Sequence, residues 1–214
     1  MEIIKPEHAG KILYPHPIIL ITSGLQHKYN VATISWYSVV SHTPSLIGFS
    51  ITPSAYSFGL IRNSGEFNIH IPTWEIMHKV HFCGTTTGAD VYKITESNIL
   101  TIPSRMTRGV WLTECVAHIE CSLVGYYPFG DRMWIVGEVI LAAVEKEGFT
   151  IEDGWHEDVQ LLTHYGGFRY GCQGKVYETK DRRTITPAFL DTRSTEEMKP
   201  LRGNYMPPLF PPKE

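Results

Sequence analysis

The sequence lacks the marks of several classes of protein. Among its 214 residues, no apolar run approaches the roughly 18 residues that a membrane-spanning helix needs. The start, MEIIKPEHAG, is not a basic region followed by an apolar stretch, so it does not resemble a signal peptide. A formal net charge of −3 gives no basic footprint for nucleic acid. We therefore expect a cytoplasmic protein that binds neither membranes nor nucleic acid.

Patterns that bind metal ions are also missing. The ten histidines form no HExxH or HxxxH pair, and the four cysteines have no CxxC spacing. In a reducing compartment these cysteines are expected to be free thiols; they are Cys83, Cys115, Cys121 and Cys172. Nothing in the spacing supports a metal site, and no motif singles out a protein nucleophile. We therefore assign neither a metal ligand nor a catalytic residue.

The most informative stretch that is present runs from Asn30 to Ser41. If it forms one strand, successive side chains point to opposite faces. One face is then mostly apolar, with Ala32, Ile34, Trp36 and Val40. The other face carries three hydroxyls, on Thr33, Ser35 and Tyr37. Two interpretations follow: a surface that holds an oxygen-rich ligand, or a half-exposed strand, since Thr and Tyr favour strands anyway. The stretch alone favours the second.

Further strands and two helices are predicted along the chain. Strands are expected at 18–23, 46–52, 66–71 and 175–177, with a long hairpin formed by 116–127 and 132–144. Helices are expected at 53–65, with a Ser54 cap and a terminal Gly65, and at 74–82. Short strands without βαβ alternation predict a mainly β protein, an antiparallel barrel with a few short flanking helices.

We expect one domain over residues 1–179. A proline-rich C-terminal extension, 180–214, then follows. This extension is unlike the rest of the chain in composition, and we expect it to lie across the body of the protein or across a partner subunit.

Two segments have the composition of anion sites. The start of the helix at 53–65 carries Ser54, Tyr56 and Ser57, where free amides favour an anion. A helix cap and an anion site are equally supported there. The Gly/Thr loop at 83–90 precedes Lys93 and could hold a phosphate, but the loop alone favours an ordinary connection. On the predicted strand at 116–127, His118 and Glu120 are expected on a solvated face.

Several short motifs follow one another in order across residues 12–178. In sequence, they are Asn30-x-x-Thr33-x-Ser35-Trp36, Pro44, Ser50-Ile51, Leu60-Ile61-x-x-Ser64-Gly65-Glu66-Phe67-x-Ile69, Cys83-Gly84, Gly88-x-Asp90-x-x-Lys93, and Gly130-Asp131 before Ile135-Val136-Gly137-Glu138-Val139. In this order they resemble the flavin reductase family. That family has the FMN-binding split β-barrel fold and includes flavoredoxin-like proteins.

The resemblance implies a cofactor, FMN, bound without a covalent bond at the interface of a homodimer. By position, the ring and its phosphate arm would be lined by Asn30, Thr33, Ile34, Ser35 and Trp36. Ser50, Ile51 and Thr52 would continue that wall, and Tyr56, Ser57 and Lys93 would serve the ribityl phosphate. His164 and Tyr165 fall where family members often place a polar or aromatic group near the nicotinamide or the flavin.

Two functions of different classes follow from the resemblance. The first is an FMN-dependent NAD(P)H:flavin oxidoreductase, which uses NADH or NADPH and passes electrons to free flavin, ferric iron or a protein. The second is a flavoredoxin-like electron-transfer flavoprotein that takes electrons from a partner protein and has no nicotinamide site. A third reading is a flavin or haem binding module without turnover. Because this family does not use the GxGxxG dinucleotide motif, its absence here does not separate the first two.

Overall fold

A computed structural model describes residues 1–25, 28–172 and 174 of the chain. The expected strand at 175–177 and the proline-rich segment 180–214 lie outside the described residues. The helical elements are η1 (Pro6–Leu13), α1 (Tyr56–Ser64), η2 (Trp74–Ile76), α2 (Met77–Thr85) and α3 (Lys93–Glu96). The strands are β1 (His16–Pro17), β2 (Ile19–Leu25), β3 (Lys28–Ile34), β4 (Tyr37–Ser41), β5 (Leu46–Ile51), β6 (Glu66–Ile71), β7 (Thr101–Pro103), β8 (Val110–Leu112), β9 (Ala117–Phe129), β10 (Arg132–Val144), β11 (Phe149–Thr150), β12 (Gly154–Trp155), β13 (Leu162–His164) and β14 (Tyr170–Cys172).

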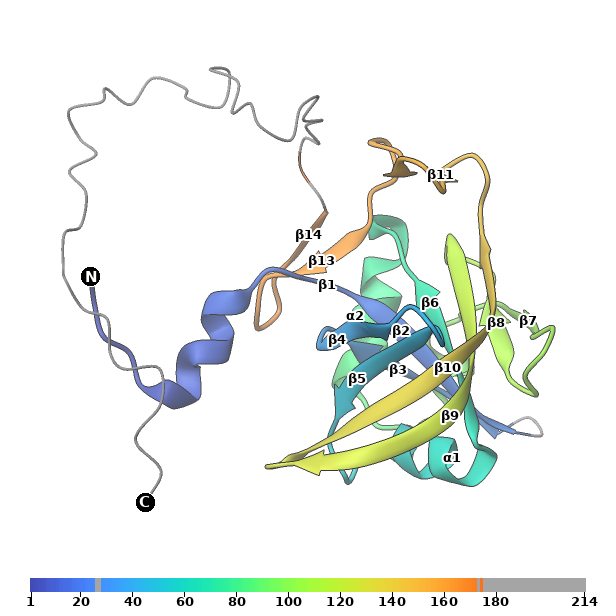
Figure 1. The fold of residues 1–214 in the computed structure, drawn as a ribbon, viewed down its shortest axis with the longest axis horizontal. Helices are drawn as coiled ribbons and strands as arrows, with labels where there is room; N and C mark the ends of the chain where they lie inside the picture. Colours follow the sequence, from blue (N-terminus) through green and yellow to red (C-terminus); the bar gives the residue numbers. More distant parts are fainter. Residues whose placement is uncertain (26–27, 173, 175–214) are drawn as a thin grey trace. The chain divides into compact units, whose positions relative to one another are not determined.

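The main sheet closes on itself. Its seven strands are antiparallel, in the order β3-β2-β6-β9-β10-β5-β4 (Figure 1). β3 and β4 are therefore the two edges, yet only Ser35 and Trp36 separate them along the chain. Three Cα–Cα steps span at most roughly 11 Å, so the two edges must lie close together. The sheet is a barrel that is split at this seam, as the sequence predicts.

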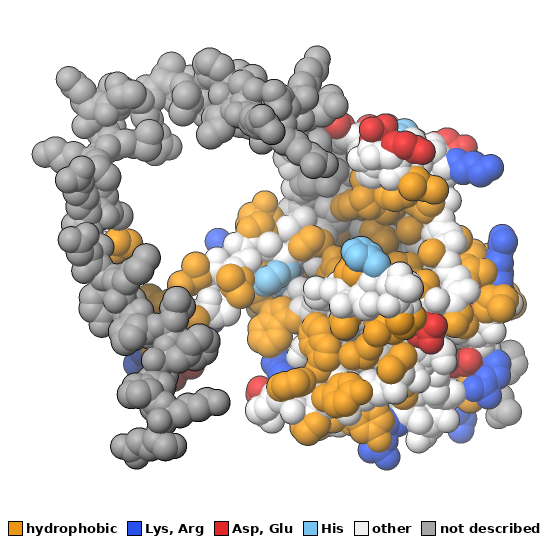
Figure 2. Space-filling model, viewed as in Figure 1, with side chains coloured by type: hydrophobic (Ala, Val, Ile, Leu, Met, Phe, Trp, Pro, Cys, Tyr) orange, Lys and Arg blue, Asp and Glu red, His pale blue; other side chains and the backbone are white. Residues whose placement is uncertain are grey.

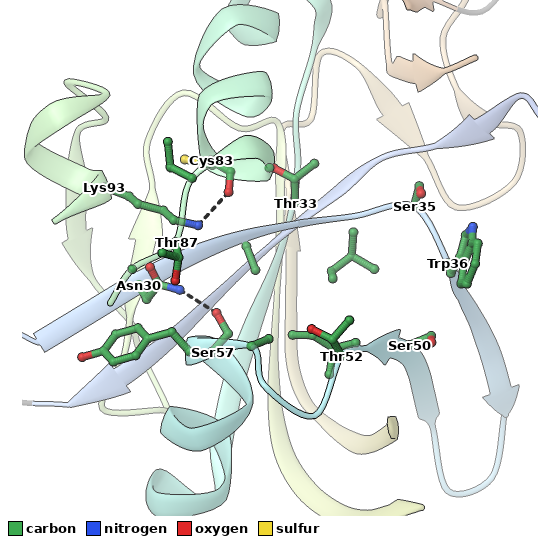
Figure 3. A pocket seen from close by; sticks show the side chains of 18 of the residues that line it. Asn30, Thr33, Ser35, Trp36, Ser50, Thr52, Ser57, Cys83, Thr87 and Lys93 are labelled. Carbon is green, nitrogen blue, oxygen red and sulfur yellow. Dashed lines mark hydrogen bonds between the residues drawn. The ribbon is translucent and has the colours of Figure 1, made fainter. Parts of the chain in front are cut away.

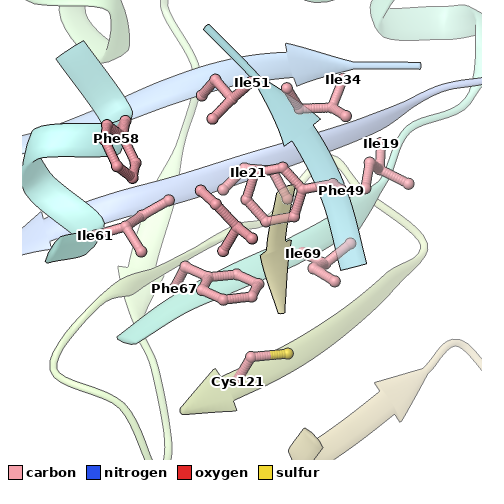
Figure 4. Close-up of a cluster of buried hydrophobic side chains, with 11 residues drawn as sticks. Ile19, Ile21, Ile34, Phe49, Ile51, Phe58, Ile61, Phe67, Ile69 and Cys121 are labelled. Atoms are coloured by element: carbon pink, nitrogen blue, oxygen red, sulfur yellow. The ribbon is translucent and has the colours of Figure 1, made fainter. Parts of the chain in front are cut away.

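The barrel interior holds one hydrophobic cluster. Nearly every strand of the main sheet sends side chains into it, and α1 adds two from one end (Figure 4). Its buried members are Ile19, Ile21, Ile34, Phe49, Ile51, Phe58, Ile61, Phe67, Ile69, Cys121 and Ile135. The predicted apolar face of β5, with Ile47, Phe49 and Ile51, indeed packs here. Burial of this area is the main stabilising contribution to such a barrel.

A second cluster lies on the outer face of β2 and β3. Ile18 and Leu20 of the apolar run point there, whereas Ile19 and Ile21 point into the barrel. The cluster is covered mainly by α2, with Val80 fully buried. Both faces of this edge of the sheet are therefore covered, which explains why the run at 18–21 is apolar at every position instead of alternating.

The stretch from 30 to 41 is not the single strand that we predicted. β3 ends at Ile34, and β4 begins at Tyr37. The two-residue corner changes the alternation: Tyr37 packs against the barrel core, whereas Trp36 is 41% exposed. The prediction of one continuous hydroxyl face from Thr33 to Tyr37 was therefore wrong, because the chain turns at the seam of the barrel.

Two local predictions around the helices have different outcomes. Gly65 follows α1 with a φ of 74°, the left-handed conformation expected of a terminal glycine. The residue that caps the start of α1 is Ala55, however, and it makes no side-chain cap hydrogen bond. The Ser54 cap was therefore wrong. The first amides of α1 are thus left without a serine side chain in the capping position.

The predicted solvated face on β9 is instead buried at Glu120 and half-buried at His118. Glu120 is fully buried beneath the segment 104–111. Its Oε1 accepts hydrogen bonds from the Arg105 amide (2.8 Å) and from Trp111 Nε1 (2.9 Å). Its Oε2 accepts from the amides of Met106 (2.8 Å) and Thr107 (2.5 Å). Burial raises the pKa of the carboxyl, but these amide hydrogen bonds outweigh it and lower the pKa overall.

His70 and His118 continue this buried polar layer. Thr22 Oγ1 donates to Val110 O (2.9 Å), so the ring N–H of His70 Nε2 must donate to Thr22 Oγ1 (2.9 Å). His70 Nδ1 is then an acceptor, and it receives the N–H of His118 Nδ1 at 2.9 Å. The chain of donors fixes both rings in neutral, opposite tautomers. Burial lowers the pKa of His70 well below its usual range and that of His118 to about 4.

Candidate functional site

One cavity of about 430 Å³ collects the residues that the sequence singled out. It lies between the end of β3, the end of β5, the start of α1 and the loop after α2 (Figure 3). All eleven residues that the resemblance implies for FMN binding line this main cavity: Asn30, Thr33, Ile34, Ser35, Trp36, Ser50, Ile51, Thr52, Tyr56, Ser57 and Lys93. They come from segments up to 63 residues apart, and the barrel seam brings them together.

The wall formed by β3 is fixed by hydrogen bonds to neighbouring helices. The buried Asn30 amide donates to Ser57 Oγ in the first turn of α1 at 2.7 Å. Thr33 Oγ1 donates to the Val80 carbonyl of α2 at 2.7 Å. These side chains therefore hold α1 and α2 against the strand. Thr33 keeps only its acceptor lone pairs for a ligand, because its proton is already used.

The start of α1 presents free backbone donors to the main cavity. The first four amides of a helix have no intrahelical partner, and the aligned peptide dipoles give that end a partial positive charge. Tyr56 and Ser57 are the first two residues of α1, and both line the main cavity. This geometry suits an anion.

Lys93 adds a buried ammonium to the same end. The residue is only 4% exposed, and its Nζ donates to the carbonyls of Val31 (3.0 Å) and Cys83 (2.7 Å). Burial lowers its pKa. An ammonium has three N–H donors, so the two carbonyls leave one for a ligand in the cavity. Figure 3 marks the hydrogen bond from Nζ to the Cys83 carbonyl, and Lys93 lines the main cavity together with Asn30, Ser57 and Thr87.

The end of α2 and the loop that follows it approach β3 closely at two glycines, Gly84 in the helix and Gly88 in the loop. A Cβ on Gly88 would overlap the Asn30 side-chain oxygen and lie 2.7 Å from the Tyr56 ring. A Cβ on Gly84 would lie 3.1 Å from that of Thr33. Thr86 and Thr87 of this loop line the main cavity. The sequence alone favoured an ordinary loop for residues 83–90, but the structure brings this segment to the main cavity. Its glycines and threonines were the sequence feature that could have identified it as part of the site.

The opposite end of the main cavity is aromatic and cationic. The Arg132 guanidinium, at the start of β10, lies 5.0 Å from the centre of the Trp36 ring. Its Nε is buried and makes no hydrogen bond within the described residues; it is 3.6 Å from Asp131 Oδ2. Sequence reasoning missed Arg132, Tyr14 and Cys83 as lining residues. No local motif points to Arg132 or Tyr14, because each comes from a segment whose pattern serves another element, whereas Cys83 is part of the Cys83-Gly84 motif but was given no role in the site.

His164 and Tyr165 do not line the main cavity. His164 Nε2 donates a hydrogen bond to the Gly167 carbonyl at 2.9 Å, because a carbonyl oxygen can only accept. The His164 ring meets that of Tyr14, a main-cavity residue, edge to face at 5.2 Å. Tyr165 lies instead at a second cavity beside α2.

The metal-binding side chains and the thiols of the chain also bear on the chemistry of the site. The described residues hold no group of three or more His, Cys, Asp or Glu side chains placed to bind a metal ion. The cysteines are free thiols, as predicted, and burial raises the pKa of Cys83 at the cavity. In the described part of the chain, no helix is long and apolar enough to cross a bilayer.

A split antiparallel barrel with a polar, partly cationic cavity at its seam defines a class of small-molecule binding proteins. Within that class, residues 11–170 match the family described as flavin reductase like domain, so the chain belongs to this family. An uncharacterized protein of Archaeoglobus fulgidus is 35% identical over 128 residues, which cover 60% of this chain and 72% of that relative.

Solved structures show the same fold. The FMN-binding protein of Thermus thermophilus, with bound 1-cyclohex-2-enone, superposes with a TM-score of 0.73 at 23% identity, covering 84% of this chain and 98% of that one. The flavoredoxin of Methanosarcina acetivorans gives a TM-score of 0.71 at 23% identity, covering 86% and 97%. The predicted FMN-binding split-barrel fold is therefore confirmed.

Proposed function

We propose that this protein is an FMN-dependent oxidoreductase of the flavin reductase type. It binds FMN in the main cavity and passes electrons from NADH or NADPH to an acceptor such as free flavin or ferric iron. The observation that carries the proposal is the gathering of all eleven residues at one cavity, in a chain that belongs to the flavin reductase like domain family. The cavity volume of about 430 Å³ falls within the ~300–1,000 Å³ usual for ligand sites.

The phosphate of FMN fits the end of the main cavity at α1. Tyr56 and Ser57 offer backbone amides at the positive end of the helix, and Lys93 offers its third N–H. Charged hydrogen bonds of this kind are the strong ones. Gly88 keeps that end open, because a side chain there would occupy the space beside Asn30. This set supports Tyr56, Ser57 and Lys93 as the phosphate-binding residues.

The ring of FMN fits the rest of the main cavity, between the wall formed by the end of β3 and the wall formed by the end of β5. The side chains of Ile34 and Ile51 are buried in the barrel core, so these residues meet a ligand only through their backbone. The Ser50 amide donates to the Trp36 carbonyl at 2.9 Å and ties the walls together. The Arg132 Nε is a buried donor for which a ligand carbonyl is a suitable partner. When bound, FMN supplies the hydride and electron chemistry, and the protein orients it and excludes water.

The proposed assembly is a homodimer. Hydrophobic side chains gather on the face that carries β4, β5 and β10 (Figure 2). On β4, Val39 is 60% and Val40 47% exposed, next to the exposed Trp36 at the cavity. A contiguous apolar surface of this kind marks an interface. A second copy on this face would cover the open side of the main cavity and shield a bound flavin from water.

The proposed cofactor is tested first by an absorption spectrum and a flavin titration. Protein purified after expression with riboflavin supplementation is expected to be yellow, and stripped protein should quench FMN fluorescence at one site per chain. Riboflavin, which lacks the phosphate, is the matched control and should bind at least about tenfold more weakly. Colourless protein that takes up no FMN would contradict the proposal.

The proposed reaction is tested by mixing the FMN-loaded protein anaerobically with NADH or NADPH. Bleaching of the flavin absorbance, followed by recovery on adding free flavin or ferric iron, is the expected result. The second candidate is a flavoredoxin-like carrier that takes electrons from a partner protein. If no second copy of the chain covers them, the exposed Trp36, Val39 and Val40 offer such a partner an apolar surface beside the cavity, so this use of the surface excludes the homodimer proposed on the same face. Bleaching by dithionite but by neither nucleotide would select this carrier.

The positions of His164 and Tyr165 near a nicotinamide remain a proposal. His164 is held by Gly167 and touches the main-cavity residue Tyr14, which keeps it near the mouth. Replacing His164 by Gln should raise the KM for the nucleotide without changing the affinity for FMN. An unchanged KM would remove His164 from the substrate site.

A further inference from the structure

A second cavity, which we call the aromatic pocket, lies between α2 and the turn that joins β13 to β14. Its volume is about 750 Å³, larger than that of the main cavity. Four aromatic side chains line it, from three different segments: Trp74, Tyr165, Phe168 and Tyr170. None of its lining residues lines the main cavity, and of these residues only Tyr165 has a proposed place near the nicotinamide.

The aromatic side chains of the pocket are held open to solvent. Phe168 is 80% exposed, and Tyr165 and Trp74 are 42% and 40% exposed. A single exposed aromatic residue is ordinary, but several that converge on one concavity mark a binding site. The turn is built for this: Gly166 and Gly167 have φ of 92° and 58°, just before Phe168. The aromatic pocket therefore presents several aromatic rings to solvent, a surface suited to a flat ring.

Hydrogen bonds and ring contacts fix the back of the pocket. His81 on α2 is 3.0 Å from the Tyr170 hydroxyl, and its ring meets that of Phe168 edge to face at 5.4 Å. The Tyr165 ring lies against the backbone of Gly171, where a Cβ would be 2.7 Å from the ring. These contacts hold the walls before any ligand arrives. A preorganised site loses little conformational entropy on binding.

The polar groups of the pocket favour one sign of charge in a ligand. Its lining includes the Arg169 guanidinium and two imidazoles, His78 and His81, and among the described residues that line it there is no carboxylate. Arg169 Nη2 donates to the Tyr165 carbonyl at 3.2 Å. A guanidinium has five N–H donors, so most of them are left for a ligand. A carboxylate is the group that pairs best with such a fork.

We propose that the aromatic pocket is a binding site for a small, flat aromatic carboxylate. The rings of Trp74, Tyr165 and Phe168 would enclose the aromatic part, and Arg169 would pair with the carboxylate. The site does not depend on FMN, since no residue is shared between the two cavities. Binding of a ligand to the aromatic pocket can therefore be measured whether or not the proposed flavin function is correct.

The test is isothermal titration calorimetry with 2-naphthoate on the full chain, both FMN-loaded and stripped. The neutral 2-naphthamide, which has the same shape, is the matched ligand. We expect one site for 2-naphthoate in both forms of the protein, and at least about tenfold weaker binding of the amide, because a charged hydrogen bond is lost. Equal affinity for the two ligands, or no binding of 2-naphthoate, would overturn the proposal.

Variants then locate the site. Phe168→Ala and Arg169→Gln should each weaken 2-naphthoate at least about tenfold. Phe129→Ala and Arg62→Gln, which remove an exposed aromatic ring and an exposed cation outside the pocket, should leave the affinity for 2-naphthoate unchanged. Because Arg169 also supports the turn, Arg169→Lys is included; it keeps the charge and should recover part of the affinity. If the two pocket variants bind like the two controls, the ligand lies elsewhere and the proposal fails.

Discussion

The hydrogen-bonded pair of the buried His70 and the half-buried His118 should make the folded state sensitive to mild acid. His118 and His70 share one hydrogen bond in which each ring is neutral. Burial lowers both pKa values in the folded protein, that of His118 to about 4, whereas an unfolded chain has the ordinary value of 6.5. Between about pH 4 and pH 6.5 the unfolded chain therefore binds more protons than the folded one. The free energy of unfolding must therefore fall as the pH falls through this window.

The size of the effect follows from the shift. For His118 alone, a pKa that drops from 6.5 to about 4 removes about 2 kcal/mol of stability between pH 7.5 and pH 5. His70, which is fully buried, adds to this in the same direction. Glu120 acts at lower pH: its lowered pKa means that its contribution is present above about 4.3 and is lost below that value. The window from 7.5 to 5 therefore isolates the histidines.

Urea unfolding at pH 7.5 and pH 5, with wild type and His118→Asn, measures this prediction. Asparagine keeps an N–H donor near the position of His118 Nδ1 but does not titrate, so the hydrogen bond to His70 can persist. We expect the loss of stability at pH 5 to be about 2 kcal/mol smaller in the variant than in wild type. If both proteins lose the same amount, the burial and tautomer assignment of His118 is refuted.

Three further perturbations follow from the site and from the polar layer. Lys93→Met should weaken FMN by about 1–3 kcal/mol in a fluorescence titration, because one charged phosphate partner is lost; unchanged affinity would place the phosphate elsewhere. Gly88→Ala should also weaken FMN, because its Cβ overlaps Asn30, whereas Gly59→Ala, which has open space around its Cβ, should not. Glu120→Gln should lower the free energy of unfolding by about 3 kcal/mol in urea unfolding at pH 7.5, because an amide N–H group would face backbone N–H donors. A loss below about 1 kcal/mol would contradict the role of Glu120 as the residue that holds segment 104–111 in place.

The strands of the barrel were predictable because their side chains alternate. Phe67 and Ile69 alternate with polar residues on β6, and the predicted strand has the observed bounds, Glu66–Ile71. The paired β9 and β10 were predicted as a hairpin for the same reason. Alternation identifies which face is apolar, and that face is the one that a barrel core buries.

The same alternation could not say what covers the other face. On β6 and β9 the polar partners of this pattern, such as His70 and Glu120, suggest contact with water, yet both are fully buried. They are buried because the segment 104–111, which has no strong periodic pattern, folds over them and supplies its backbone amides. Backbone donors are the same in every sequence, so a carboxylate that they satisfy has no recognisable partner in the amino-acid pattern.

The seam explains both what the sequence predicted of the site and what it missed. The stretch from Asn30 to Ser41 was predicted to be one strand with a hydroxyl-bearing face, but the chain turns at Ser35 and Trp36, where the two edges of the barrel meet. At such a corner neither edge pairs fully, so the backbone of both edges faces a cavity instead of another strand. Side chains from distant segments, Lys93 and Arg132, can then enter from the two ends. Lys93 has a local signal, a lysine soon after a Gly/Thr loop. Arg132 has none, because it reaches the cavity only when the long hairpin closes the barrel.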